Sequence, residues 1–96
     1  MAAACPEFGF EITAQLAPHV DARTRHALAA TFHTLAESNG LIADGWGERD
    51  WRYVITRDGG QAIDADRQML GDWIRSRPEI TRVEIGPIVD LKEVDV

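Results

Sequence analysis

The clearest pattern in the chain is the alternation of apolar and polar residues in "FGFEITAQL", residues 8–16. Successive side chains of a strand point to opposite faces of a sheet, so a period of two indicates a strand with one buried face. Phe8, Phe10 and Ile12 are therefore predicted to lie in the core. The outward set is predicted to be Gly9, Glu11, Thr13 and Gln15.

A helical period follows this strand. Asp21 is predicted to be the N-cap, since its side chain can accept hydrogen bonds from free amides of the first turn. The predicted helix has about 18 residues and ends at Asn39-Gly40, where glycine is favoured in the left-handed position. Its apolar stripe consists of Leu28, Phe32, Leu35 and Ala36.

The next segment predicts two short strands, about residues 41–44 and 50–57, joined through Gly45, Trp46 and Gly47. Five intervening residues with two glycines favour a bulged hairpin or a longer loop over a two-residue turn. Periodicity does not decide which face of the second strand is buried. One face carries Trp51, Tyr53 and Ile55, and the other carries Arg52, Val54 and Thr56.

The last third of the chain predicts a second helix and a final strand. Asp64 is predicted to cap the helix, and Pro78 is predicted to end it. "TRVEI", residues 81–85, alternates as a strand should. The helix face that is predicted to pack inward carries Leu70, Trp73, Ile74 and Arg77.

The order strand, helix, strand, strand, helix, strand predicts an α+β fold. Two right-handed crossovers joined by a hairpin most simply give the ferredoxin-like βαββαβ two-layer sandwich, an antiparallel sheet with two helices on one face. A chain of 96 residues has room for one core, so residues 8–96 are predicted to be a single domain, preceded by a flexible N-terminal segment, residues 1–7.

The formal net charge of −6 argues against a general nucleic-acid binder, DNA included, because nonspecific affinity depends on phosphate neutralisation by Lys and Arg. The basic residues are concentrated in the middle. Residues 49–82 contain seven basic and six acidic side chains, whereas residues 1–48 contain two and six. Any contact with an anionic partner is therefore expected in residues 49–82.

The pattern of reactive side chains predicts no enzyme, metal site or cofactor. His19, His26 and His33 recur every seven residues, which is about 10.5 Å along a helix and too far for two of them to share one ion. Neither phosphate-loop motif occurs, Cys5 lies in a terminal segment without a neighbour to lower its pKa, and Ser38 and Ser76 have no neighbouring histidine base.

A set of short motifs, in order, resembles the YggL family of small bacterial proteins associated with the large ribosomal subunit. They run through nearly the whole chain: "FGFEI", "ESNGL" at 37–41, "DGWG" at 44–47, Trp51, Asp64, Arg67, "WI" at 73–74 and Asp90. The resemblance implies a non-enzymatic accessory role at the ribosome, in maturation or as a bound factor. It also implies a Lys/Arg-rich arm at the start, which "MAAACPEF" does not contain.

The candidate binding residues are Trp46, Arg49, Arg52 and Arg57. A tryptophan between glycines beside arginines has the composition of an interaction hot spot, although folding of Trp46 over the sheet edge is an equal alternative. The partner implied is the large subunit, through protein or rRNA. The alternative function is a protein interaction module or homodimer without ribosome contact, and a monomer or weak homodimer is expected.

The chain is expected in the cytoplasm. It contains no apolar run near the ~20 residues that span a bilayer and no secretory signal pattern. No membrane contact is therefore expected.

Overall fold

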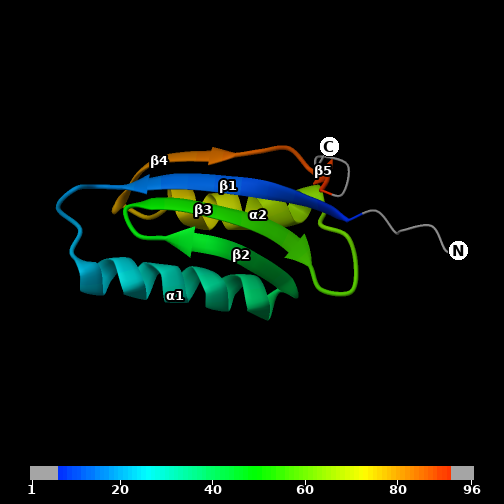
Figure 1. Ribbon diagram of the computed structural model, residues 1–96, viewed down its shortest axis with the longest axis horizontal. Helices are drawn as coiled ribbons and strands as arrows, with labels where there is room; N and C mark the ends of the chain where they lie inside the picture. The colour runs from blue at the N-terminus through cyan, green and yellow to red at the C-terminus, as the bar shows by residue number, and fades with distance from the viewer. Residues whose placement is uncertain (1–6, 92–96) are drawn as a thin grey trace, which may run out of the picture.

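The computed structural model describes residues 7–91, so Cys5, most of the predicted flexible segment and the end of the acidic tail lie outside the described residues. Two helices and five strands follow one another as shown in Figure 1. The elements are β1 (Phe8–Leu16), α1 (Ala22–Ser38), β2 (Leu41–Gly47), β3 (Asp50–Arg57), α2 (Asp64–Arg75), β4 (Ile80–Ile85) and β5 (Val89–Asp90).

The strands form one antiparallel sheet with the order β2-β3-β1-β4, and β5 pairs with the start of β1. The predicted α+β class, with two helices and an antiparallel sheet, is confirmed. Strand β5 was not predicted. Each of the two central strands, β1 and β3, is paired on both sides, whereas β2 and β4 lie at the edges.

The core lies between the sheet and the two helices. Phe32 of α1 is fully buried, and its ring centroid lies 5.5 Å from that of Trp51, 5.2 Å from that of Tyr53 and 6.0 Å from that of Trp73. These contacts join β3 to both helices. The structure therefore shows which face of β3 is buried, which periodicity did not decide. Trp51, Tyr53 and Ile55 pack inward, and Arg52, Val54 and Thr56 point away from the helices.

Helix α1 begins as predicted, because the Asp21 side chain accepts a hydrogen bond of 2.8 Å from the backbone N–H of Thr24. The predicted cap of α2 is wrong. Asp64 is the first helical residue and Ile63 precedes it as the N-cap. The buried carboxylate of Asp66 accepts from the Ile63 N–H at 2.9 Å, so the carboxylate that holds this helix start is in the first turn rather than before it.

The predicted inward face of β1 is confirmed at Phe10 and Ile12, both fully buried, and is wrong at Phe8, which is 37% exposed. Phe8 is the first residue of its strand. It is flanked there by the two-residue β5 and by the loop before α2, whose Gln61 side chain accepts from the Phe8 N–H. The helices that bury Phe10 therefore leave Phe8 partly in water.

Neither helix in residues 7–91 is long and apolar enough to cross a lipid bilayer.

Candidate functional site

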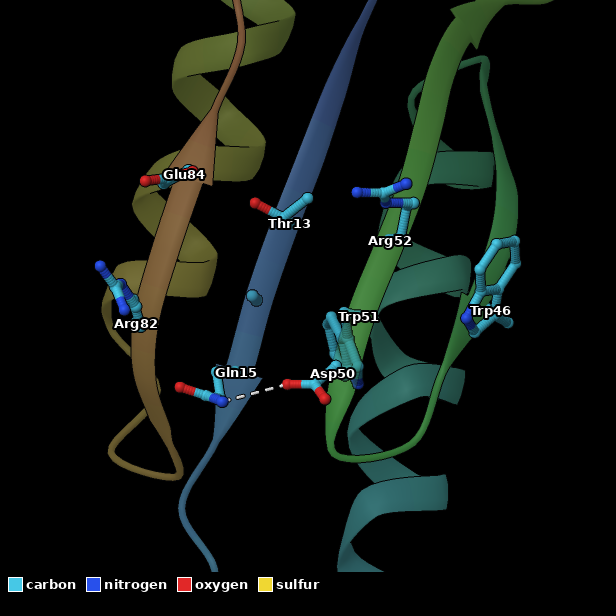
Figure 2. Close-up of a pocket in the computed structure, with 9 residues that line it drawn as sticks. Thr13, Gln15, Trp46, Asp50, Trp51, Arg52, Arg82 and Glu84 are labelled. Atoms are coloured by element: carbon cyan, nitrogen blue, oxygen red, sulfur yellow. Dashed lines mark hydrogen bonds between the residues drawn. The ribbon is translucent and has the colours of Figure 1, made fainter.

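Within residues 7–91, no element covers the face of the sheet opposite the helices, and we call it the open face. Figure 2 shows its side chains projecting to one side while both helices lie behind the strands. The outward set predicted for β1 is confirmed at Glu11, Thr13 and Gln15 and is wrong at Gly9, which is buried where a side chain would collide with the Ile55 carbonyl. The open face comprises Ile42, Asp44 and Trp46 of β2, Asp50, Arg52, Val54 and Thr56 of β3, Glu11, Thr13 and Gln15 of β1, and Arg82 and Glu84 of β4.

The strand register arranges these side chains in rows across the sheet. In the central row Arg52 lies opposite Trp46 on one side and opposite Thr13 on the other, and Thr13 in turn faces Glu84. In the next row Gln15 lies between Asp50 and Arg82. A hollow of about 450 Å³ lies over these two rows. The residues that line it are Thr13, Ala14, Gln15, Trp46, Asp50, Trp51, Arg52, Arg82 and Glu84.

Trp46 lies within an edge strand, and its predicted position in the connection between two short strands, at the hairpin tip, is wrong. Strand β2 continues through Gly47, and two residues, Glu48 and Arg49, separate it from β3. The flanking glycines have a packing role rather than a turn role. A side chain at Gly45, whose φ is 153°, would collide with the Arg52 carbonyl, and one at Gly47 would collide with the Trp51 indole.

The indole of Trp46 is 66% exposed, the highest value among the large apolar residues of the described chain. Ile42, on the same strand and face, is 46% exposed. An exposed tryptophan has a large area to bury on binding and keeps an N–H donor for a partner. A binding hot spot must be exposed before its partner binds, and Trp46 is exposed.

Charged groups on the open face interact loosely with one another. The Arg52 Nε lies 4.0 Å from a carboxylate oxygen of Glu11, and both side chains are more than half exposed. The Gln15 side chain donates to Asp50 at 3.2 Å. Such exposed contacts contribute little to stability and can be exchanged for contacts with a partner.

Arg49 lies at the same end of the sheet, in the turn between β2 and β3. Its guanidinium donates to the Pro18 carbonyl at 2.8 Å, and its own carbonyl accepts from the Leu16 N–H at 2.8 Å. These bonds tie the hairpin to the segment between β1 and α1. Arg49 is therefore at the rim of the open face and has a structural role there.

Arg57 is not brought together with the other candidate residues. It lies on the helix side of the sheet, where one guanidinium nitrogen is 2.5 Å from the buried Asp66 carboxylate and another donates to the Asn39 carbonyl at 3.2 Å. This side chain joins β3 to both helices. Its inclusion as a binding residue stays a prediction to which the geometry lends no support.

Sequence reasoning did not identify the contribution of β4. Arg82 and Glu84 complete the open face on the far side of β1. Their alternation with Val83 and Ile85 was visible in "TRVEI", but the pairing of this strand with β1 was needed to place them beside Thr13 and Gln15.

Tyr53 and His33, two titratable groups on the helix side of the sheet, pack against each other. Burial raises the pKa of Tyr53, whose ring packs edge-on against His33 at 5.2 Å. His33 thus contacts the aromatic core of the protein. No group of three or more His, Cys, Asp or Glu side chains within residues 7–91 is placed to hold a metal ion.

Fold and site together define a small two-layer α+β protein with one helix-covered sheet face and one open polar face that carries an exposed tryptophan. A family model described as "YggL 50S ribosome-binding protein" matches residues 4–92. The chain therefore belongs to the YggL family, and the resemblance read from its motifs is confirmed. No curated protein matches the chain.

Proposed function

We propose that this protein is a non-enzymatic accessory factor that binds the large ribosomal subunit through the open face of its sheet. Trp46 is the anchor of the contact, Arg52 lies beside it, and Arg49 holds the adjacent turn in place. The family description supports the target, since it names 50S ribosome binding. The observation that carries the choice of surface is the 66% exposure of Trp46 on a sheet face that the two helices leave uncovered.

The geometry supports a docking role over a catalytic one. The hollow beside Trp46 is bounded by exposed side chains on an open sheet, so it does not enclose a substrate or exclude water. A preformed surface on a rigid sheet, in contrast, binds a partner without the ordering cost of a flexible loop. Residence of the protein in the cytoplasm, where ribosomes work, is part of this proposal.

The ferredoxin-like arrangement is also part of the proposal. The strand order β2-β3-β1-β4 with both helices on one side supports it. In this arrangement the helices protect the core face and leave the four-stranded face free for a partner. A crystal structure of the protein with its subunit would test both the topology and the contact face.

A sucrose gradient tests the function most directly. Purified protein is mixed with purified large subunits at moderate salt and sedimented, and its distribution is read by immunoblot. The wild-type protein is expected to sediment with the subunit, whereas Trp46→Ala stays near the top. Ile63→Ala is the matched control, because Ile63 is also exposed, at 54%, but precedes α2 and lies outside the open face.

Two results contradict the proposal. Wild-type protein that remains at the top of the gradient has no affinity for the subunit. Equal co-sedimentation of Trp46→Ala and the wild type moves the contact to another surface. A species of twice the monomer mass, present with or without subunits, supports the alternative function of a homodimer that pairs the edge strand β2.

A further inference from the structure

The charges of the open face specify what kind of partner it fits. Four carboxylates lie on it against two guanidinium groups, which gives a net charge of −2 within a chain of net charge −6. The acidic members are Glu11, Asp44, Asp50 and Glu84, and the basic members are Arg52 and Arg82. One of the two cations, Arg52, is already near Glu11.

Most arginines in the basic middle of the chain are used internally. Arg57 pairs with Asp66, and Arg49 donates to the Pro18 carbonyl. Arg67 pairs with Asp64, and its guanidinium donates to the carbonyls of Ile85 and Gly86. Arg77 lies over the ring of Trp73, 5.2 Å from its centroid. The positive charges of residues 49–82 are thus partly paired with carboxylates, and on the open face four carboxylates outnumber the two guanidinium groups that could neutralise phosphates.

The aromatic pattern of the open face is also unsuited to RNA. Sheets of this kind that bind RNA stack bases on aromatic side chains of the central strands. Here the central strands present Thr13, Gln15, Arg52 and Val54 outward, and the exposed tryptophan is on the edge strand. A base stacked on Trp46 would also bring its phosphate near Asp44 and Asp50, which repel it.

We infer that the open face takes a lysine- and arginine-rich segment of a large-subunit protein rather than rRNA. This inference rests on the proposed ribosome binding and adds the chemistry of the partner. Proteins that coat an RNA carry excess Lys and Arg because phosphate neutralisation supplies their affinity, so basic protein segments are abundant on the target.

The open face can hold both the cationic head group and the aliphatic stem of a partner's lysine or arginine side chain. A guanidinium or ammonium group can lie over the Trp46 ring, where the π face attracts a cation. Asp44 lies two residues along the same strand face, about 7 Å away, and can accept a second cation through charge-assisted hydrogen bonds. The hollow over Thr13 and Gln15 accepts the aliphatic stem, and Glu84 closes its far side.

Charge reversal distinguishes a basic protein segment from rRNA as the partner, because it should weaken binding to the first and strengthen binding to the second. Asp44→Lys combined with Glu84→Lys adds positive charge to the open face. Both carboxylates are exposed, and within residues 7–91 neither is in a hydrogen bond or ion pair, so the fold should tolerate the change. The matched control is Glu37→Lys with Asp72→Lys, which makes the same charge change on exposed positions of α1 and α2.

Binding is measured by sedimentation against two probes, intact large subunits and the rRNA extracted from them. We expect the open-face double variant to bind intact subunits about tenfold more weakly than wild type or worse, because like charges then meet across the contact. The helix-side double variant should bind as wild type does. Extracted rRNA should bind far more weakly than the intact subunit.

Other outcomes overturn the inference in distinguishable ways. Tighter binding by the open-face variant, or full affinity for extracted rRNA, identifies RNA as the partner and leaves ribosome binding intact. Equal effects of the two double variants place the contact outside the open face. Absence of wild-type binding to intact subunits removes the proposed function itself, and the inference with it.

Discussion

Trp46 and Arg52 face each other across the antiparallel pair of β2 and β3, on the side of the sheet that the helices leave uncovered. The next residue of β3, Tyr53, and the previous one, Trp51, point the other way into the core. Two tryptophans five positions apart in the sequence therefore have opposite environments, one 66% and the other 1% exposed.

This contrast predicts that the two tryptophans have separable effects. Trp46→Ala should reduce the free energy of subunit binding by about 2 kcal/mol or more, as removal of a hot-spot residue does, and change the melting temperature little. Trp51→Ala should lower the free energy of unfolding by about 3–5 kcal/mol through the cavity it leaves. Sedimentation binding and chemical denaturation of both variants provide the measurements.

Trp51→Phe is the control for the second effect. Within residues 7–91 the buried indole N–H of Trp51 has no hydrogen-bond partner, so phenylalanine removes ring volume without breaking a hydrogen bond. It should be clearly less destabilising than alanine. Equal losses for Phe and Ala would show that the indole N–H is satisfied in solution.

Phe10 and Phe8 form a second pair that tests the core boundary. Phe10→Ala should cost about 3–5 kcal/mol of unfolding free energy, because a fully buried ring is removed. Phe8→Ala should cost much less, since that ring is already partly in water. Similar costs in urea denaturation would contradict the exposure of Phe8.

The Arg57–Asp66 pair is predicted to be structural. Asp66→Ala removes the acceptor of the Ile63 N–H and the partner of a guanidinium that is only 32% exposed. We expect a loss of about 1–3 kcal/mol in the free energy of unfolding. Binding to large subunits, measured at a temperature where the variant is folded, should be unchanged.

Arg57→Ala completes that test. It should also reduce stability and spare subunit binding, because the side chain lies on the helix side of the sheet. A specific loss of binding in a fully folded Arg57→Ala protein would return this residue to the contact surface.

Asp21 gives a pH-dependent prediction. Hydrogen bonds from the backbone N–H and then the side chain of Thr24 lower the pKa of Asp21. A carboxylate with a lowered pKa in the folded state stabilises the protein above its ordinary pKa, and this contribution disappears as the pH falls through the lower, folded-state pKa. Asp21→Ala should therefore melt at a lower temperature than wild type at neutral pH, and the difference should shrink in strong acid.

Thermal melts of both proteins from neutral pH down to the acid limb measure this difference. A gap in melting temperature that is constant across the range would mean that the charge of Asp21 has no part in capping α1. Thr24 would then be held by the cap geometry alone.

The sequence predicted the regular elements well because their signals are local. The Asp21 cap, the helical stripe through Phe32 and the alternation from Phe10 to Leu16 each depend on neighbours within a few positions, and each is confirmed. Strand β5 could not be predicted in this way. It has two residues, too few for a period, and it exists through pairing with the distant Phe8 and Gly9.

The site was harder to predict because its features depend on contacts between strands. Gly45 and Gly47 resemble a turn when only the sequence is considered. Their small size is required by the Arg52 carbonyl and the Trp51 ring on the neighbouring strand, so the segment remains extended. Arg57 adds to the positive charge counted in residues 49–82. Its pairing with Asp66 depends on the packing of α2 against the sheet, which the sequence does not show.

The antiparallel pairing of β1 with both β4 and β5 also determines how the protein would respond to mechanical force. The Leu91 N–H donates to the Glu7 carbonyl, so the described chain enters and leaves the sheet at the same end. Traction applied between these two residues would open β5 and then β4 from β1 one hydrogen bond at a time, as a zipper opens, instead of shearing many bonds at once. Along this axis the fold would yield at low force, while the hairpin that carries Trp46, at the opposite end of β1, would be among the last parts to lose its pairing.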